Sequence, residues 1–229
     1  MPHQRRSSSK TPHDVAARIQ QQIVDGTLRP GDRLPAQRGL SESMGVSRAS
    51  LREALSVLET LGLIDIRPGL GVFVAHPASG GPRGRVLDAG SARDVYEARL
   101  ALEGSAAALA AERIEQEQLA HVAALVEDMT EAMSRSDLVA MAACDSAFHD
   151  AIMEAARNPL LAGMYRSARA AMEETQRAPM AGRATLADTV AEHRAIVMAL
   201  ASGDPAGAMA AMRRHIAGSA RRLGVALSI

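Results

Sequence analysis

Four side chains that can bind a metal ion fall on apolar stripes in the second half of the sequence. Asp145 and His149 share one helical face with apolar neighbours, because all of these residues recur at steps of three or four. Two later stripes of the same kind contain His193 and His215. One carboxylate and three imidazoles are therefore expected to face the interior of a helical domain.

These groups suggest a specific chemistry. A buried carboxylate needs a partner, because removing an unpaired charge from water is costly. Imidazole nitrogens and a carboxylate oxygen suit a divalent transition metal, and an i, i+4 pair offers a workable bite. The alternative is that each histidine is a separately satisfied core residue. Arg99 also lies on an apolar stripe, either as an anchor for a ligand carboxylate or as the partner of a local acid such as Glu103.

Six helices are expected to position these residues. From residue 92 onward strand signals are absent, while Ala, Met, Leu, Glu and Arg dominate. The helices are expected near 92–113, 115–134, 136–156, 159–177, 185–201 and 204–224. The sequence thus predicts an all-α six-helix bundle over 92–229, which would bind the metal and an effector.

The front of the chain has a different pattern. Three helical segments, the second of them short, precede two Val- and Ile-rich runs around a Gly-bearing turn, which is typical of a β-hairpin. That order predicts a winged helix-turn-helix over 11–75. Residues 1–10 are expected to be a disordered arm, and 76–91, rich in Pro, Gly and Ser, a linker. The fold class is therefore mainly α.

The third helix of this module would be the recognition helix. Arg48 and Arg52 lie four residues apart at its start and so share a face. A guanidinium suits guanine or phosphate in a bidentate way. Ser47 and Ser50 add hydroxyls, and Arg38 lies where the short helix would cross the DNA backbone. A solvated basic face is the alternative.

Composition excludes several classes of protein. Basic and acidic residues number 26 each, so the chain has no net charge that would indicate binding to a membrane or to nucleic acid. The single Cys144 excludes a disulfide framework, and an aromatic content of 2% argues against stacking on single-stranded nucleic acid. With neither a secretory signal nor a long apolar run, we expect a cytoplasmic protein with no membrane partner.

Short motifs give the front half a family resemblance. They are Leu34-Pro35, Arg38-x-Leu40, Val46-Ser47-Arg48, Leu51-Arg52-Glu53-Ala54-Leu55 and Gly69-x-Gly71-x-Phe73-Val74. Together they resemble the DNA-binding domain of the GntR family of bacterial transcription regulators. The resemblance implies a homodimer on a double-stranded operator with two-fold related half-sites. It also implies DNA contacts by Arg38, Arg48 and Arg52, with the wing tip near Gly69 in the minor groove.

The second half is similar to the ligand-binding domain of the FadR subgroup of that family. The similarity rests on Tyr96-Glu97-x-Arg99, Asp145-x-x-Phe148-His149, Asn158-Pro159, Glu192-His193-Arg194-x-Ile196 and His215. It implies that Asp145, His149, His193 and His215 hold a divalent metal, zinc being the first expectation and nickel or manganese the alternatives. It also implies that Arg99 faces an effector pocket.

The leading hypothesis is a metabolite-responsive regulator, with repression as the first expectation. Its effector would be a small carboxylate that bridges Arg99 and the metal. One alternative is a metal-sensing repressor with no organic effector. Another is a metal-dependent hydrolytic enzyme, for which Glu192 is a poor general base, because adjacent residues on a helix point about 100° apart.

Overall fold

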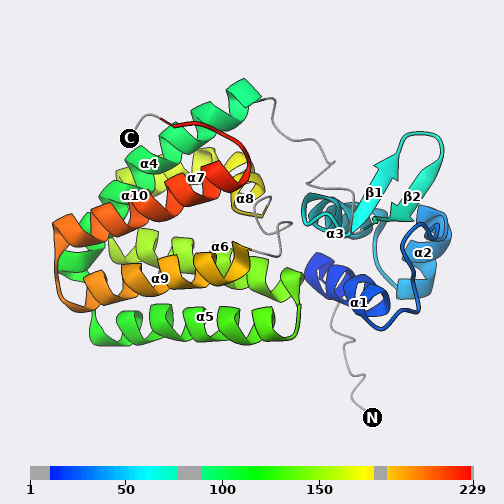
Figure 1. The fold of residues 1–229 in the computed structure, drawn as a ribbon, viewed down its shortest axis with the longest axis horizontal. Helices are drawn as coiled ribbons and strands as arrows, with labels where there is room; N and C mark the ends of the chain where they lie inside the picture. The colour runs from blue at the N-terminus through cyan, green and yellow to red at the C-terminus, as the bar shows by residue number, and fades with distance from the viewer. Residues whose placement is uncertain (1–10, 77–88, 178–184, 228–229) are drawn as a thin grey trace, which may run out of the picture.

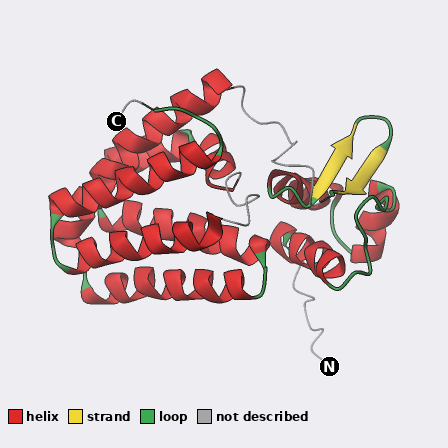
Figure 2. Ribbon diagram, in the orientation of Figure 1, coloured by secondary structure: helices red, strands yellow, loops and turns green. Residues whose placement is uncertain are grey.

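The computed structural model describes residues 11–76, 89–177 and 185–227, and within them the chain forms two lobes (Figure 1). The predicted arm (1–10) and residues 77–88 of the predicted linker lie outside the described residues. The first lobe contains α1 (Pro12–Val24), α2 (Gln37–Met44), α3 (Arg48–Thr60), β1 (Ile64–Arg67) and β2 (Gly71–Val74). The mainly α fold class with one small hairpin is confirmed, as Figure 2 shows.

Local signals explain the elements of the first lobe. Thr11 and Asp14 form a capping box at the start of α1, where Pro12 occupies the first turn. Gly45 ends α2 in the left-handed conformation, with φ of 69°. The apolar faces of the helices bury Val15, Ile19, Leu51, Leu55 and Leu58, which belong to an apolar cluster that continues into the second lobe.

The wing is a two-stranded antiparallel hairpin in which Ile64 pairs with Val74 and Arg67 with Gly71. Gly69 has φ of 73° and Gly71 has φ of 121°, conformations that side chains with a Cβ rarely adopt. A Cβ at Gly71 would also lie 2.8 Å from Nε of Arg33, so this glycine lets the preceding loop pack on the wing.

All the regular secondary structure in the described residues of the second lobe is helical. They are α4 (Ala89–Arg113), α5 (Gln116–Ser134), α6 (Leu138–Ala155), α7 (Pro159–Ser167), α8 (Arg169–Arg177), α9 (Leu186–Ala201) and α10 (Pro205–Arg222). The segment expected as one helix over 159–177 is thus two helices. The backbone leaves helical geometry at Ala168, with φ of −104° and ψ of 5°. No Pro or Gly marks this break in the sequence.

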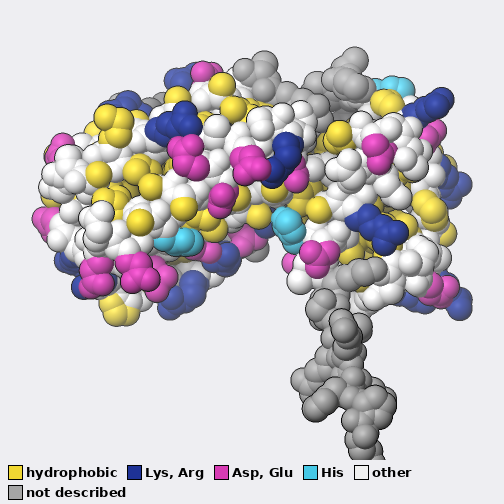
Figure 3. All heavy atoms as spheres, turned by 90° about the horizontal axis from the view of Figure 1, so that it is seen from below, with side chains coloured by type: hydrophobic (Ala, Val, Ile, Leu, Met, Phe, Trp, Pro, Cys, Tyr) yellow, Lys and Arg dark blue, Asp and Glu magenta, His cyan; other side chains and the backbone are white. Residues whose placement is uncertain are grey.

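The long helices of this lobe pack side by side (Figure 1). α10 lies against α4 and α9, and α5 lies against α6 and α9, while α6 also contacts α4. Small buried alanines on α4 and α10, such as Ala107 and Ala211, allow their backbones to approach closely. Figure 3 shows acidic and basic side chains close together on the helical lobe.

One buried side chain joins the two lobes. Gln20 of α1 is 4% exposed, and its Nε2 donates to Oδ1 of Asp137 at 2.7 Å. Its Oε1 accepts from the backbone N–H of Val139 at 3.0 Å. Asp137 is also the N-cap of α6, so Gln20 completes the hydrogen bonding of that helix end. We call this arrangement the Gln20 link. The lobes also meet where α3 contacts α8.

Among the described residues, no helix is both long enough and apolar enough to cross a bilayer.

Candidate functional site

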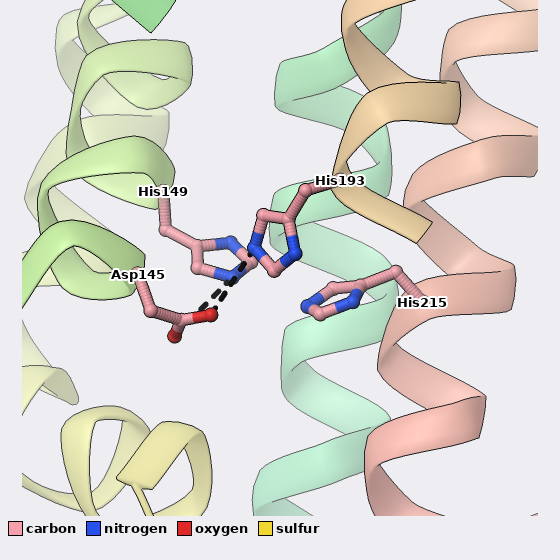
Figure 4. Close-up of side chains that lie close together, drawn as sticks. All are labelled: Asp145, His149, His193 and His215. Atoms are coloured by element: carbon pink, nitrogen blue, oxygen red, sulfur yellow. Dashed lines mark ion pairs between the residues drawn. The ribbon is translucent and has the colours of Figure 1, made fainter. Parts of the chain in front are cut away.

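The four predicted ligand residues converge inside the helical lobe. Asp145 and His149 come from successive turns of α6, His193 from α9 and His215 from α10 (Figure 4). All four are buried, and one potential ligand atom from each lies within 4.8 Å of the others. Phe148 packs between these helices, its ring centre 4.6 Å from that of His193. The structure thus brings together the residues that helical periodicity placed on separate stripes.

Each imidazole has an acceptor near its Nδ1 atom, and at His193 and His215 the contact is a hydrogen bond. Oε2 of Glu103 lies 2.6 Å from Nδ1 of His149. The carbonyl of Thr189 lies 2.7 Å from Nδ1 of His193, and Oε2 of Glu192 lies 3.0 Å from Nδ1 of His215. A neutral histidine that donates from Nδ1 keeps its lone pair on Nε2, which is the form that binds a metal. The hydrogen bonds at His193 and His215 therefore favour Nε2 as the ligand atom of both residues, and the Glu103 carboxylate lies on the corresponding side of His149.

Two of these inward nitrogens lack a hydrogen-bond partner. Nε2 of His149 and Nε2 of His193 are buried and make no hydrogen bond within the described parts of the chain, and the same is true of Nδ1 of His149. Nε2 of His193 is 3.1 Å from Oδ1 of Asp145, and Nε2 of His149 is 3.9 Å from Oδ2. Buried unpaired polar atoms are costly and therefore call for an explanation. A metal ion between them would satisfy both.

The donor set fits a divalent transition metal. Three imidazole nitrogens and one carboxylate oxygen match the ligands of zinc, and nickel and manganese accept them too. Bonds of about 2.0–2.2 Å would hold ligand atoms within about 4.4 Å of one another. The present spacing, within 4.8 Å, is a few tenths of an ångström wider, so binding an ion would draw the ligand residues together by about that amount.

The protonation states also suit metal binding. Burial lowers the pKa of His215, and the neighbouring His193 lowers it further, to about 3. Burial disfavours the charged form of Asp145, but contact with His193 and the other imidazoles outweighs it and brings the pKa to about 2. At neutral pH the cluster therefore offers an ionised carboxylate and, at His215, a neutral imidazole, as a ligand set requires.

Arg99, the predicted effector contact, is fully buried and already engaged. Its Nε donates to Oε1 of Glu103 at 2.7 Å, and its Nη2 lies 3.5 Å from Oε2. Its Nη1 lies 3.4 Å from Oγ1 of Thr175. The pairing with Glu103 is the alternative that the i, i+4 spacing offered. Because Glu103 also contacts His149, Arg99 reaches the cluster through this carboxylate.

A small cavity lies beside the cluster. Its volume is about 10 Å³, and it is lined by Arg99, Asp145, Gln176, Thr189, His215, Ser219 and Arg222. That volume holds about one water molecule. Arg222 was not anticipated from the sequence. Its position seven residues after His215, on the same helical face, is the signal that could have indicated it.

Glu192 is the second residue that sequence reasoning undervalued. Its carboxylate bridges His215 and the guanidinium of Arg222, which donates from Nη1 at 3.0 Å and from Nη2 at 2.8 Å. Burial raises its pKa, but these partners outweigh burial and lower the value to about 2. A Cβ at Gly218 would collide with this carboxylate, so that glycine leaves the room it needs.

The predicted DNA-contact residues all lie on the first lobe. Arg48 and Arg52 are exposed on the first turns of α3. Ser47 is the N-cap of that helix, and its Oγ accepts from the backbone N–H of Ser50 and contacts the Ser50 hydroxyl at 2.9 Å. Arg38 is exposed on α2 and pairs with Glu42 at 3.1 Å.

The wing places Gly69 at the exposed turn between its two strands. Arg67 flanks this turn, with its guanidinium 4.5 Å from the ring centre of Phe73.

Two protein-family models match the chain, one in each lobe. Residues 11–74 match the family described as "Bacterial regulatory proteins, gntR family", and residues 94–218 match the family described as "FCD domain". The HTH-type transcriptional regulator Rv0494 of Mycobacterium tuberculosis is 33% identical over 216 residues, which cover 91% of this chain and 88% of that protein. LutR of Bacillus subtilis, also an HTH-type transcriptional regulator, is 30% identical over 207 residues, covering 85% and 92%.

A solved structure shares the fold. It is a putative transcriptional regulator GntR from Rhodococcus sp. RHA1, with a TM-score of 0.54 and 22% identity. The match covers 94% of this chain and 99% of that one.

Proposed function

The chain belongs to the GntR family of bacterial transcription regulators, in its FadR-like subgroup with an FCD domain, and on that premise we propose that a bound metal and a small organic acid control its binding to DNA. The protein is a DNA-binding regulator and not an enzyme, in keeping with its relatives. The single observation that carries the proposal is the buried Asp–His cluster with its unpaired Nε2 atoms.

One divalent metal ion per chain would be held by Asp145, His149, His193 and His215. Zinc is the first choice, and nickel and manganese are the alternatives. The ligands come from α6, α9 and α10, so the ion would cross-link three helices and stabilise the lobe in proportion to its binding. When bound, the ion supplies coordination sites for an anionic ligand.

The effector would be a small carboxylate in the cavity next to this cluster. Arg99 borders the cavity and contributes positive charge, while Glu103 fixes its orientation. The small volume of the cavity favours a second candidate, in which the metal alone is the signal. The two candidates differ in whether any organic acid changes operator binding of the metal-loaded protein.

DNA would be read by a homodimer on two-fold related half-sites. Arg48 and Arg52 at the start of α3 would contact bases or phosphates, with Arg38 on the backbone and Gly69 in the minor groove. The hydroxyls of Ser47 and Ser50 lie at the same end of α3. A change in the helical lobe would reach this surface through the Gln20 link and through α8, which contacts α3.

The test is elemental analysis of protein purified without a His-tag, followed by gel-shift titration of an operator with and without chelator. We expect about one metal per chain, and operator affinity that changes when the metal is removed. His193→Ala should abolish metal uptake, whereas His121→Ala, outside the cluster, should retain it. The proposal would be contradicted by protein that contains no metal and whose melting temperature does not change on addition of metal or of chelator.

A further inference from the structure

We infer that the cavity beside the Asp–His cluster takes a small hydroxy acid with a single negative charge, and that Arg222 and Gln176 contact it directly. The inference rests on the proposed function and deepens it, because it specifies the ligand class and two contact residues. The relevant observation is a pair of unsatisfied atoms that belong to residues lining the cavity.

One nitrogen of the Arg222 guanidinium makes no hydrogen bond to the described residues. The side chain of Arg222 is 10% exposed, and Nη1 and Nη2 both donate to Glu192. Its Nε is buried and has no hydrogen-bond partner in the described parts of the chain. A buried guanidinium N–H without an acceptor is costly, and a ligand carboxylate would remove that cost with a charge-assisted bond.

By contrast, each guanidinium nitrogen of Arg99 and each hydroxyl of Ser219 and Thr189 already has at least one hydrogen-bond partner. All three nitrogens of Arg99 have partners in Glu103 and Thr175. The hydroxyl of Ser219 lies 3.1 Å from Oη of Tyr96, and that of Thr189 donates to the carbonyl of Thr185. Arg222 is thus the guanidinium around the cavity with a wholly unpartnered nitrogen among the described residues, and we assign it the direct contact with the anion.

Gln176 has an acceptor atom that lacks a donor. Its Nε2 donates to Oη of Tyr165 at 3.5 Å, while its Oε1 is buried without a partner in the described residues. Oε1 can only accept, so a ligand that satisfies it must bring an N–H or O–H. A hydroxyl next to the carboxylate meets this demand and adds little volume. Acetate would leave this acceptor unpaired.

Charge balance fixes the net charge of the ligand. The buried network contains three carboxylates, from Glu103, Asp145 and Glu192, and two guanidinium groups, from Arg99 and Arg222. Its net charge is therefore −1, which a divalent metal would change to +1. A monoanion neutralises that excess, whereas a dianion would leave an uncompensated charge in a buried site.

Size limits the ligand further. A volume of about 10 Å³ admits about one water molecule, so even a two-carbon acid must displace a side chain. Gln176 lies on α8, which also contacts α3 of the DNA-binding lobe. Entry of the acid would thus act on a helix that touches the recognition helix.

The experiment is calorimetric titration of the metal-loaded full chain with glycolate and with acetate. These probes have the same charge and carbon number and differ by one hydroxyl. We expect glycolate to bind at least fivefold more tightly than acetate. Gln176→Met should bring glycolate down to the affinity of acetate, and Arg222→Lys should weaken both acids at least tenfold without changing their ratio. Gln21→Met and Arg221→Lys, at exposed positions, are the matched controls.

Metal content, measured on every sample, separates two kinds of failure. A chain that takes up no metal overturns both the proposed function and this inference. A metal-loaded parent that binds neither acid, or binds both equally, overturns this inference alone. So does an Arg222→Lys variant that binds both acids as the parent does.

Discussion

Replacing Gln20 with Met should uncouple the two lobes while leaving the interior of each intact. Methionine matches glutamine in length but makes neither hydrogen bond of the Gln20 link. The bond to the Asp137 carboxylate is worth about 1.5–3 kcal/mol, and the bond from the Val139 N–H about 0.5–1.5 kcal/mol. Because methionine partly compensates through apolar packing, we expect a loss of about 2–4 kcal/mol in the free energy of docking between the lobes.

Two measurements check this prediction. Differential scanning calorimetry should show one of the lobes unfolding earlier in Gln20→Met, because the lobes no longer stabilise each other. Gel-shift titration should show that metal changes operator affinity less in the variant than in the parent. The neighbouring variant Gln21→Met, exposed on the same helix, should behave as the parent. A Gln20→Met protein with parental unfolding and a parental metal response would refute the reasoning.

Three further predictions concern the cluster and the recognition helix. Glu192→Gln should weaken metal affinity about 10–100-fold, measured by competition with a chelator, because the orienting carboxylate of His215 is lost. Metal-free protein should lose stability as the pH falls from 6.5 toward 3, by at most about 1.4 kcal/mol per pH unit from His215. In that window the unfolded chain binds a proton that the folded chain, with its depressed pKa, does not; denaturant titrations that show no change between pH 7 and pH 4 would contradict this. Arg52→Ala should cost about 1–3 kcal/mol of operator affinity, or reduce the salt slope by about one if the contact is to phosphate, and Arg221→Ala should do neither.

Helical periodicity is the signal from which the four ligand residues could be predicted. Asp145, His149, His193 and His215 each fall on an apolar stripe, and a helix that buries its stripe must bury them too. The partners of the imidazoles were harder to predict because they depend on how helices pack. Glu192 lies on α9 next to His193, but its carboxylate reaches His215 on α10, in space left open by Gly218.

Two features of the fold had no local signal at all. The break between α7 and α8 occurs at an alanine within a run of good helix formers, so propensity alone predicted one continuous helix. Arg169, at the start of α8, pairs with Asp150 of α6 at 2.8 Å, which is a tertiary contact. Likewise the Gln20 link joins residues more than 100 positions apart, and nothing in the sequence distinguishes Gln20 from its two glutamine neighbours.

Two of the four ligand residues, Asp145 and His149, lie on α6. Their position explains how binding of a metal ion could affect the DNA-binding lobe. Asp145 lies eight residues after Asp137, about 12 Å along a rigid helix. Drawing Asp145 and His149 toward an ion by a few tenths of an ångström would therefore move the start of α6 by a similar amount. Hydrogen bonds near 2.7 Å and 3.0 Å weaken steeply when stretched or bent, and both bonds of the Gln20 link end on that helix start. A displacement too small to rearrange the core is thus large enough to favour one docking geometry of the lobes over another.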